Sequence, residues 1–147
     1  MQYKEGDGVN KAHSAVLITL TLSVLNLCVM ILSMMTKTRV FSDYSTPDYP
    51  PVVITLFTVF LITLGVLSIW QLFSGLDGQA MRGKILLLLA VDYFVVYVAD
   101  IANIFPGSAE PIGQMMFAVE VFGAVLAVLL FVSAGWYIKA VNVSESG

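Results

Sequence analysis

The sequence predicts an all-α, polytopic membrane protein folded as an antiparallel bundle of four transmembrane helices with short loops. Three observations lead to this prediction. The mean hydropathy is +0.90, and 59% of the 147 residues are hydrophobic, whereas soluble domains are usually about 45–50% apolar. Only 12% of the residues are charged. Finally, the chain contains four apolar runs that are each long enough to cross a bilayer core of about 30 Å.

The four expected spans form one transmembrane domain over residues 14–138. They cover residues 14–35, 51–73, 85–105 and 112–138. We expect helices, because irregular backbone in lipid cannot satisfy its polar groups and the runs lack the alternation of barrel strands. Prolines mark the boundaries: Pro51 opens the second run, Pro106 follows the third and Pro111 precedes the fourth.

Short polar tails are expected at residues 1–13 and 139–147. Basic residues favour the cytoplasmic side of a membrane. If both termini are cytoplasmic, only Lys37 and Arg39 among the seven basic residues lie outside. We therefore expect cytoplasmic termini. The residues expected to anchor the inner interface are Trp70, Arg82, Lys84, Trp136, Tyr137 and Lys139.

The net charge of −3 lies inside the apolar runs. Acidic and basic residues outside the runs balance one another, which leaves the three carboxyl groups of Asp92, Asp100 and Glu120. The acidic character therefore belongs to the expected membrane interior. The chain has no basic run, so we expect no binding of nucleic acid.

Ionisable residues inside a membrane are costly, and they mark functional sites by default. Helical spacing places Asp92, Asp100 and Asn103 on one side of the third span, flanked by Tyr93 and Tyr97. These residues are the first part of a predicted intramembrane polar cluster.

Glu120 of the fourth span completes the acidic part of this cluster, at a depth between the two aspartates. Asn26 joins from the first span, where polar residues share a narrow face with Met30. They are Thr19, Ser23, Asn26 and Ser33. Three roles remain open for the cluster: hydrogen bonding between helices, a proton or cation path along the three carboxylates, or contact with a partner subunit or ligand.

The fourth span also carries small residues at helical spacing, which allow helices to pack closely. They are Gly123, Ala124, Ala127, Ala134 and Gly135. We expect packing within the chain, with contact to another subunit as the alternative.

The residue content argues against an enzyme. His13 is the only histidine and Cys28 the only cysteine, which excludes histidine-based metal sites, histidine-containing catalytic triads and disulfides within the chain. The sequence has no glycine-rich phosphate loop. We expect no catalytic residues, no metal and no cofactor.

Residues 89–99, LAVDYFVVYVA, place Asp92 in an apolar run and follow it with aromatic residues and a small one. This pattern resembles the third span of fungal-type members of the MARVEL-domain tetraspan family. Phe57, Phe60 and Trp70 of the second span are compatible with it. The resemblance extends from Lys11 to Lys139 and implies a membrane-organising or trafficking role without catalysis.

The sequence therefore predicts a non-enzymatic tetraspan protein in a lipid bilayer. It would act as a membrane-organising scaffold or as an accessory subunit, associated with itself or with other membrane-protein subunits. The alternative is a small proton or cation channel or transporter that uses Asp92, Asp100 and Glu120.

Overall fold

The computed structural model describes residues 3–35, 50–73, 79–104 and 113–145, and these residues form four α-helices. The helices are α1 (Tyr3–Met35), α3 (Pro51–Phe73), α4 (Gln79–Ile101) and α5 (Gln114–Glu145). Residues 36–49 of the first expected loop, residues 74–78 of the second and the whole of the third lie outside the described residues, as do Lys37 and Arg39.

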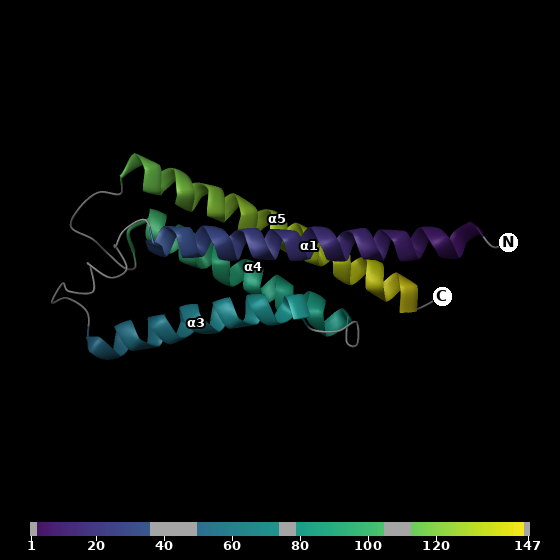
Figure 1. Cartoon of the computed structure of the whole chain (residues 1–147), viewed down its shortest axis with the longest axis horizontal. Coiled ribbons are helices and arrows are strands. Elements are labelled where there is room, and N and C mark those ends of the chain that lie inside the picture. Colours follow the sequence, from purple (N-terminus) through teal and green to yellow (C-terminus); the bar gives the residue numbers. More distant parts are fainter. Residues whose placement is uncertain (1–2, 36–49, 74–78, 105–112, 146–147) are drawn as a thin grey trace.

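Successive helices run in opposite directions, so that α1 begins and α5 ends at the same end of the molecule (Figure 1). The most extensive packing joins α5 to α4 and to α1, and these three helices supply most of the buried core, to which α3 adds Leu61 and Leu64. Helix α3 contacts α1 and α4 much more sparsely. Its Pro51 end lies apart from the other helices, whereas its Phe73 end approaches α4 (Figure 1).

Three helices are long and apolar enough to cross a membrane: α1 over His13–Met34, α3 over its whole length and α5 over Gln114–Val143. Helix α4 has 23 residues, as many as α3. It differs in composition, because it carries four charged residues within its length. They are Arg82, Lys84, Asp92 and Asp100.

The helix boundaries agree with the sequence for α3 and differ elsewhere. Helix α1 already begins at Tyr3, within residues 1–13, which the sequence predicted as a short polar tail. Once a helix exists, extending it avoids the cost of nucleation, so a short polar stretch without proline can continue it. Helix α4 begins at Gln79, ahead of the expected start at residue 85, and α5 continues to Glu145.

Asn103 ends α4. Its φ of 53° places it in the left-handed region, where asparagine is tolerated better than most residues. The Asn103 N–H donates to the Asp100 carbonyl, and the Ile104 N–H donates to the Ala99 carbonyl, each at 2.9 Å. This is the Schellman pattern of a helix C-terminus. The expected member of the polar cluster is therefore an exposed capping residue.

The polar face of α1 points inward, as its spacing predicted. Thr19, Ser23 and Asn26 are fully buried, together with Met30. The Thr19 hydroxyl and the Asn26 amide each donate to a carbonyl four residues earlier in the helix, at 2.7 and 3.0 Å. Part of the polar content of this face is thus satisfied within α1 itself.

The small residues of α5 separate into two groups. Gly123, Ala127 and Ala134 are buried and Ala124 is half-buried, which fits close helix packing. Gly135 is exposed, and no atom lies within 4 Å of a Cβ added there. Gly135 therefore lies off the packing face, although the sequence placed it there. Ala134 lies on the packing face, and the next residue, Gly135, is rotated away from that face by one helical position.

Candidate functional site

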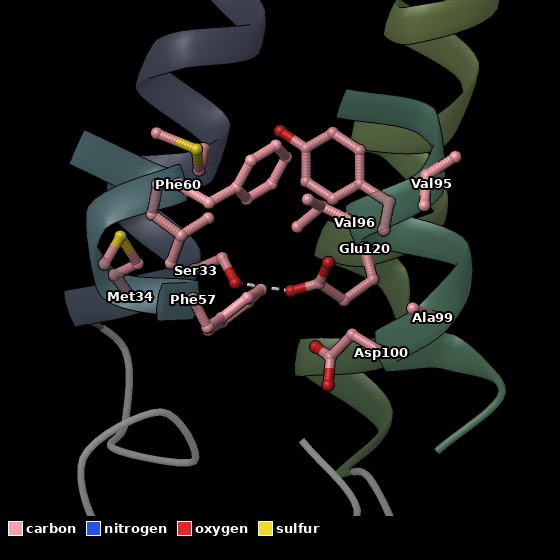
Figure 2. Close-up of a pocket in the computed structure, with 12 residues that line it drawn as sticks. Ser33, Met34, Phe57, Phe60, Val95, Val96, Ala99, Asp100 and Glu120 are labelled. Atoms are coloured by element: carbon pink, nitrogen blue, oxygen red, sulfur yellow. Dashed lines mark hydrogen bonds between the residues drawn. The ribbon is translucent and has the colours of Figure 1, made fainter. Parts of the chain in front are cut away.

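A pocket of about 260 Å³ lies between the first half of α3 and the other three helices. We call it the α3 pocket (Figure 2). Phe57, Phe60 and Leu61 form its α3 wall, and Met30 and Met34 line it from α1. The pocket follows from the sparse packing of α3, because the other helices do not fill the space beside its first half.

Glu120 reaches this pocket from α5, although only 1% of its surface is exposed. The Ser33 hydroxyl of α1 donates a hydrogen bond to Glu120 Oε1 (Figure 2). A polar group buried away from water costs free energy unless it is hydrogen-bonded. The contact therefore stabilises the buried carboxyl group and also ties α1 to α5.

Asp100 of α4 lines the same pocket and is half-buried. In Figure 2 its carboxyl group points to the same side as that of Glu120, toward Ser33 and Phe57. Carboxyl groups from two neighbouring helices, α4 and α5, therefore line one pocket.

Asp92 is not part of this arrangement. It is half-buried and does not line the α3 pocket. Eight residues separate it from Asp100, which is about 12 Å along a helix. The side of α4 that enters the core at this level is formed by Tyr93 and Leu89, beside Asp92. The α3 pocket therefore contains two of the three carboxyl groups that were expected in the polar cluster.

Tyr97 forms the inner wall of the pocket and contacts two other helices. Its hydroxyl donates to the Asn26 carbonyl of α1 at 3.0 Å. Its ring lies against Gly123 of α5, because a Cβ added at that glycine would come within 2.4 Å of the ring. Tyr97 thus joins α4 to both α1 and α5.

Tyr93 makes the corresponding contact to α3. Its hydroxyl and that of Ser68 share a hydrogen bond of 2.7 Å. The rings of Tyr93 and Tyr97 lie 6.3 Å apart and nearly parallel, at 17°. Both tyrosines were predicted to flank the polar cluster. In the structure both are buried, and their hydroxyl groups form hydrogen bonds to neighbouring helices.

The predicted interface anchors fall into an exposed and a buried group. Trp70, Lys84, Trp136 and Lys139 are exposed. Arg82 and Tyr137 are buried, at 8% and 1% exposure. Arg82 Nη2 donates to the Gln71 carbonyl, in the last turn of α3. A cation at this place also complements the negative end of the helix dipole. Arg82 is therefore an interhelical contact.

Some features of the site were not predicted from the sequence. Ser33 itself was expected on the polar face of α1, seven positions after Asn26 and about two helical turns along the same face. The pairing of Ser33 with Glu120 was not predicted, because it depends on how α1 and α5 are rotated. The positions of Phe57 and Phe60 in the pocket wall could not be predicted either, because they depend on how α3 is rotated.

The described parts of the chain contain no group of three or more His, Cys, Asp or Glu side chains that could hold a metal ion. The chemistry of the α3 pocket therefore comes from two carboxyl groups, two hydroxyl groups and the surrounding apolar side chains. Such a set can bind a cation, bind hydrogen-bond donors or exchange protons.

Comparison with curated proteins and with solved structures gives no match. A family described as Domain of unknown function (DUF8051) matches residues 12–146. The matched region contains most of α1 and all of α3, α4 and α5. The chain therefore belongs to the DUF8051 family.

Proposed function

We propose that this protein is a non-enzymatic tetraspan membrane protein that organises a membrane or serves as an accessory subunit of a larger membrane complex. The observation that carries the proposal is the sparse packing of α3. Only four of its residues are buried: Leu61, Leu64, Ser68 and Gln71. The exposed residues of this apolar helix, among them Val59, Ile62 and Val66, are available for lateral contacts with other membrane helices.

The contacts between α3 and its neighbours support the proposed function. Within lipid, apolar surface gives no hydrophobic driving force for helix association, so packing and polar contacts decide it. The polar contacts of α3 with its neighbours include the Ser68–Tyr93 hydrogen bond and the Arg82–Gln71 contact. Both lie in its second half. In its first half, Val59 and Ile62 are exposed and can contact a helix of another membrane protein.

The tetraspan topology counts α4 as the third of four membrane spans, with both termini in the cytoplasm. At 1.5 Å per residue, its 23 residues extend over about 34 Å, enough to cross the hydrocarbon core. Arg82 and Lys84 lie near its first turn, at the end where α1 begins and α5 ends. Basic residues at that end favour a cytoplasmic location for it. The resemblance to MARVEL-domain proteins supports the same topology and role.

Assembly in a bilayer tests the proposal. Native mass spectrometry after extraction in a mild detergent should detect an oligomer or a copurifying membrane protein. Ile62→Trp on the exposed side of α3 should weaken this assembly. Val132→Trp, a similarly exposed position on α5, should leave it intact. A lone monomer in all three samples would contradict the proposal.

A second function, proton or cation transport, is favoured by the shared location of Glu120 and Asp100 in the α3 pocket. Its test is a flux assay in liposomes that contain a pH-sensitive dye. Transport through these carboxyl groups should be lost in Glu120→Gln and in Asp100→Asn. A flux that is absent, or is unchanged by both substitutions, would contradict it.

A further inference from the structure

We infer that the α3 pocket binds an amphiphilic organic cation, namely a primary ammonium group that carries an apolar chain. This inference is independent of the proposed scaffolding role. It depends on three properties of the pocket: its carboxyl groups, its aromatic wall and its opening to the outer surface of the helices.

The carboxyl groups define the head group. Glu120 and Asp100 both point into the α3 pocket (Figure 2), and none of its twelve described lining residues is basic. Glu120 accepts a hydrogen bond from the Ser33 hydroxyl in this pocket, and a carboxylate offers about four acceptor positions in all. A primary ammonium has three N–H donors and the complementary charge. It can therefore bridge two carboxyl groups from two helices.

The aromatic wall favours the same head group. The rings of Phe57 and Phe60 have centroids 6.4 Å apart, and Phe57 extends toward Glu120 in Figure 2. A cation over an aromatic face is stabilised by the ring quadrupole, by about 0.5–2 kcal/mol depending on desolvation. An anionic or neutral head group would not gain this interaction.

The remaining lining accounts for the apolar chain. Met30, Met34 and Leu61 form an apolar floor, and methionine adapts readily to irregular ligands. Phe60 and Val95 line the pocket and are also exposed on the helix surface, at 37% and 56%. The α3 pocket therefore reaches the outer surface, where a chain can extend into lipid. Its volume of about 260 Å³ is close to the lower limit for ligand pockets, so it holds the head group and the start of the chain.

Binding to the purified protein in nanodiscs tests this inference. The probe is dodecylamine, with dodecanol and dodecyl sulfate as neutral and anionic controls, and empty nanodiscs correct for partition into lipid. We expect dodecylamine to bind at least tenfold more tightly than either control. Hexylamine, added from water, distinguishes the source: tight binding of hexylamine supports a water-borne amine, and selective binding of dodecylamine alone supports a membrane-resident one.

Substitutions locate the site. Glu120→Gln and Asp100→Asn should each weaken dodecylamine binding by about tenfold or more, since each removes a charged hydrogen bond. Asp92→Asn is the matched control, because Asp92 lies on α4 like Asp100 but outside the pocket. This variant should bind dodecylamine as tightly as the parent protein does. If Glu120→Gln does not fold, Asp100→Asn and Phe57→Leu decide the question.

Three results would overturn the inference. These are equal affinities for dodecylamine and dodecanol, full affinity in both Asp100→Asn and Phe57→Leu, or an equal loss in Asp92→Asn. A copurified chain that cross-links at Val95, combined with no amine binding, would instead identify a partner protein as the occupant of the pocket.

Discussion

Tyr97 and Gly123 are a matched pair across the interface between α4 and α5. A methyl group added at Gly123 would lie 2.4 Å from the Tyr97 ring carbon Cζ. Carbon atoms in contact are ordinarily about 3.5–4.0 Å apart. The tyrosine ring can therefore occupy this position only because position 123 has no side chain, and its hydroxyl can then reach Asn26 on the far helix.

The first prediction concerns this pair. Gly123→Ala should destabilise the protein by about 1–3 kcal/mol, because the added methyl group overpacks the interface. Reversible unfolding in mixed micelles measures the change. Gly135→Ala is the control: its added methyl group meets no atom within 4 Å, so the unfolding free energy should stay the same or rise slightly. Equal losses in both variants would contradict the assigned packing.

The second prediction separates the two tyrosines of α4. Tyr93→Phe removes the hydrogen bond to Ser68 and should loosen α3, whereas Tyr97→Phe removes the one to Asn26 and should leave α3 in place. Each should cost about 0.5–1.5 kcal/mol. Distances between spin labels at exposed Val66 and Val132 report the position of α3. A broader distance distribution is expected in Tyr93→Phe only, and the same broadening in both variants would refute the assignment.

The third prediction concerns the contact between α1 and α5. Ser33→Ala, Glu120→Gln and the double variant form a thermodynamic cycle, which isolates the interaction of the two side chains. Hydrogen bonds between helices in membranes are worth about 0.6 kcal/mol on average and up to about 1.7 kcal/mol. We expect a coupling energy toward the upper end, since Glu120 is buried. Additive losses would show that the two side chains do not interact.

The fourth prediction concerns Arg82. Arg82→Met should detach the second half of α3 from α4 and lower the free energy of unfolding by about 1–3 kcal/mol, because it removes a buried hydrogen bond from a charged donor. Lys84→Met removes the same charge at an exposed position nearby. It therefore controls for the effect of positive charge on membrane topology, and it should cost less than about 0.5 kcal/mol. Comparable losses would mean that charge at the membrane surface, and not the Gln71 contact, is what matters.

Helical periodicity was sufficient to predict parts of this structure. Pro51 and the apolar run behind it predicted the bounds of α3, and the spacing of Thr19, Ser23 and Asn26 predicted the buried side of α1. These features depend on local sequence alone, because residues three or four apart share one helix face.

Other features depend on how the helices are tilted and rotated against one another, which packing decides and periodicity does not. Asp92 and Gly135 lie one residue away from core positions, and this offset removes each from its expected cluster. Arg82 was predicted at the surface because its burial depends on the approach of the α3 C-terminus. The set of residues that line the α3 pocket also depends on this packing, so periodicity could not predict it.

The charged residues of α4 have a consequence for biogenesis. A segment that carries two basic and two acidic residues inserts poorly into lipid when it leaves the translocation machinery without contacts to other helices. Its buried groups find their neighbours on α1, α3 and α5, and α5 is synthesised last. Under the proposed tetraspan topology, we therefore expect α4 to enter the bilayer only after α5 has been synthesised. Chains truncated after residue 104 should then leave α4 outside the bilayer, which glycosylation mapping of engineered sites would detect.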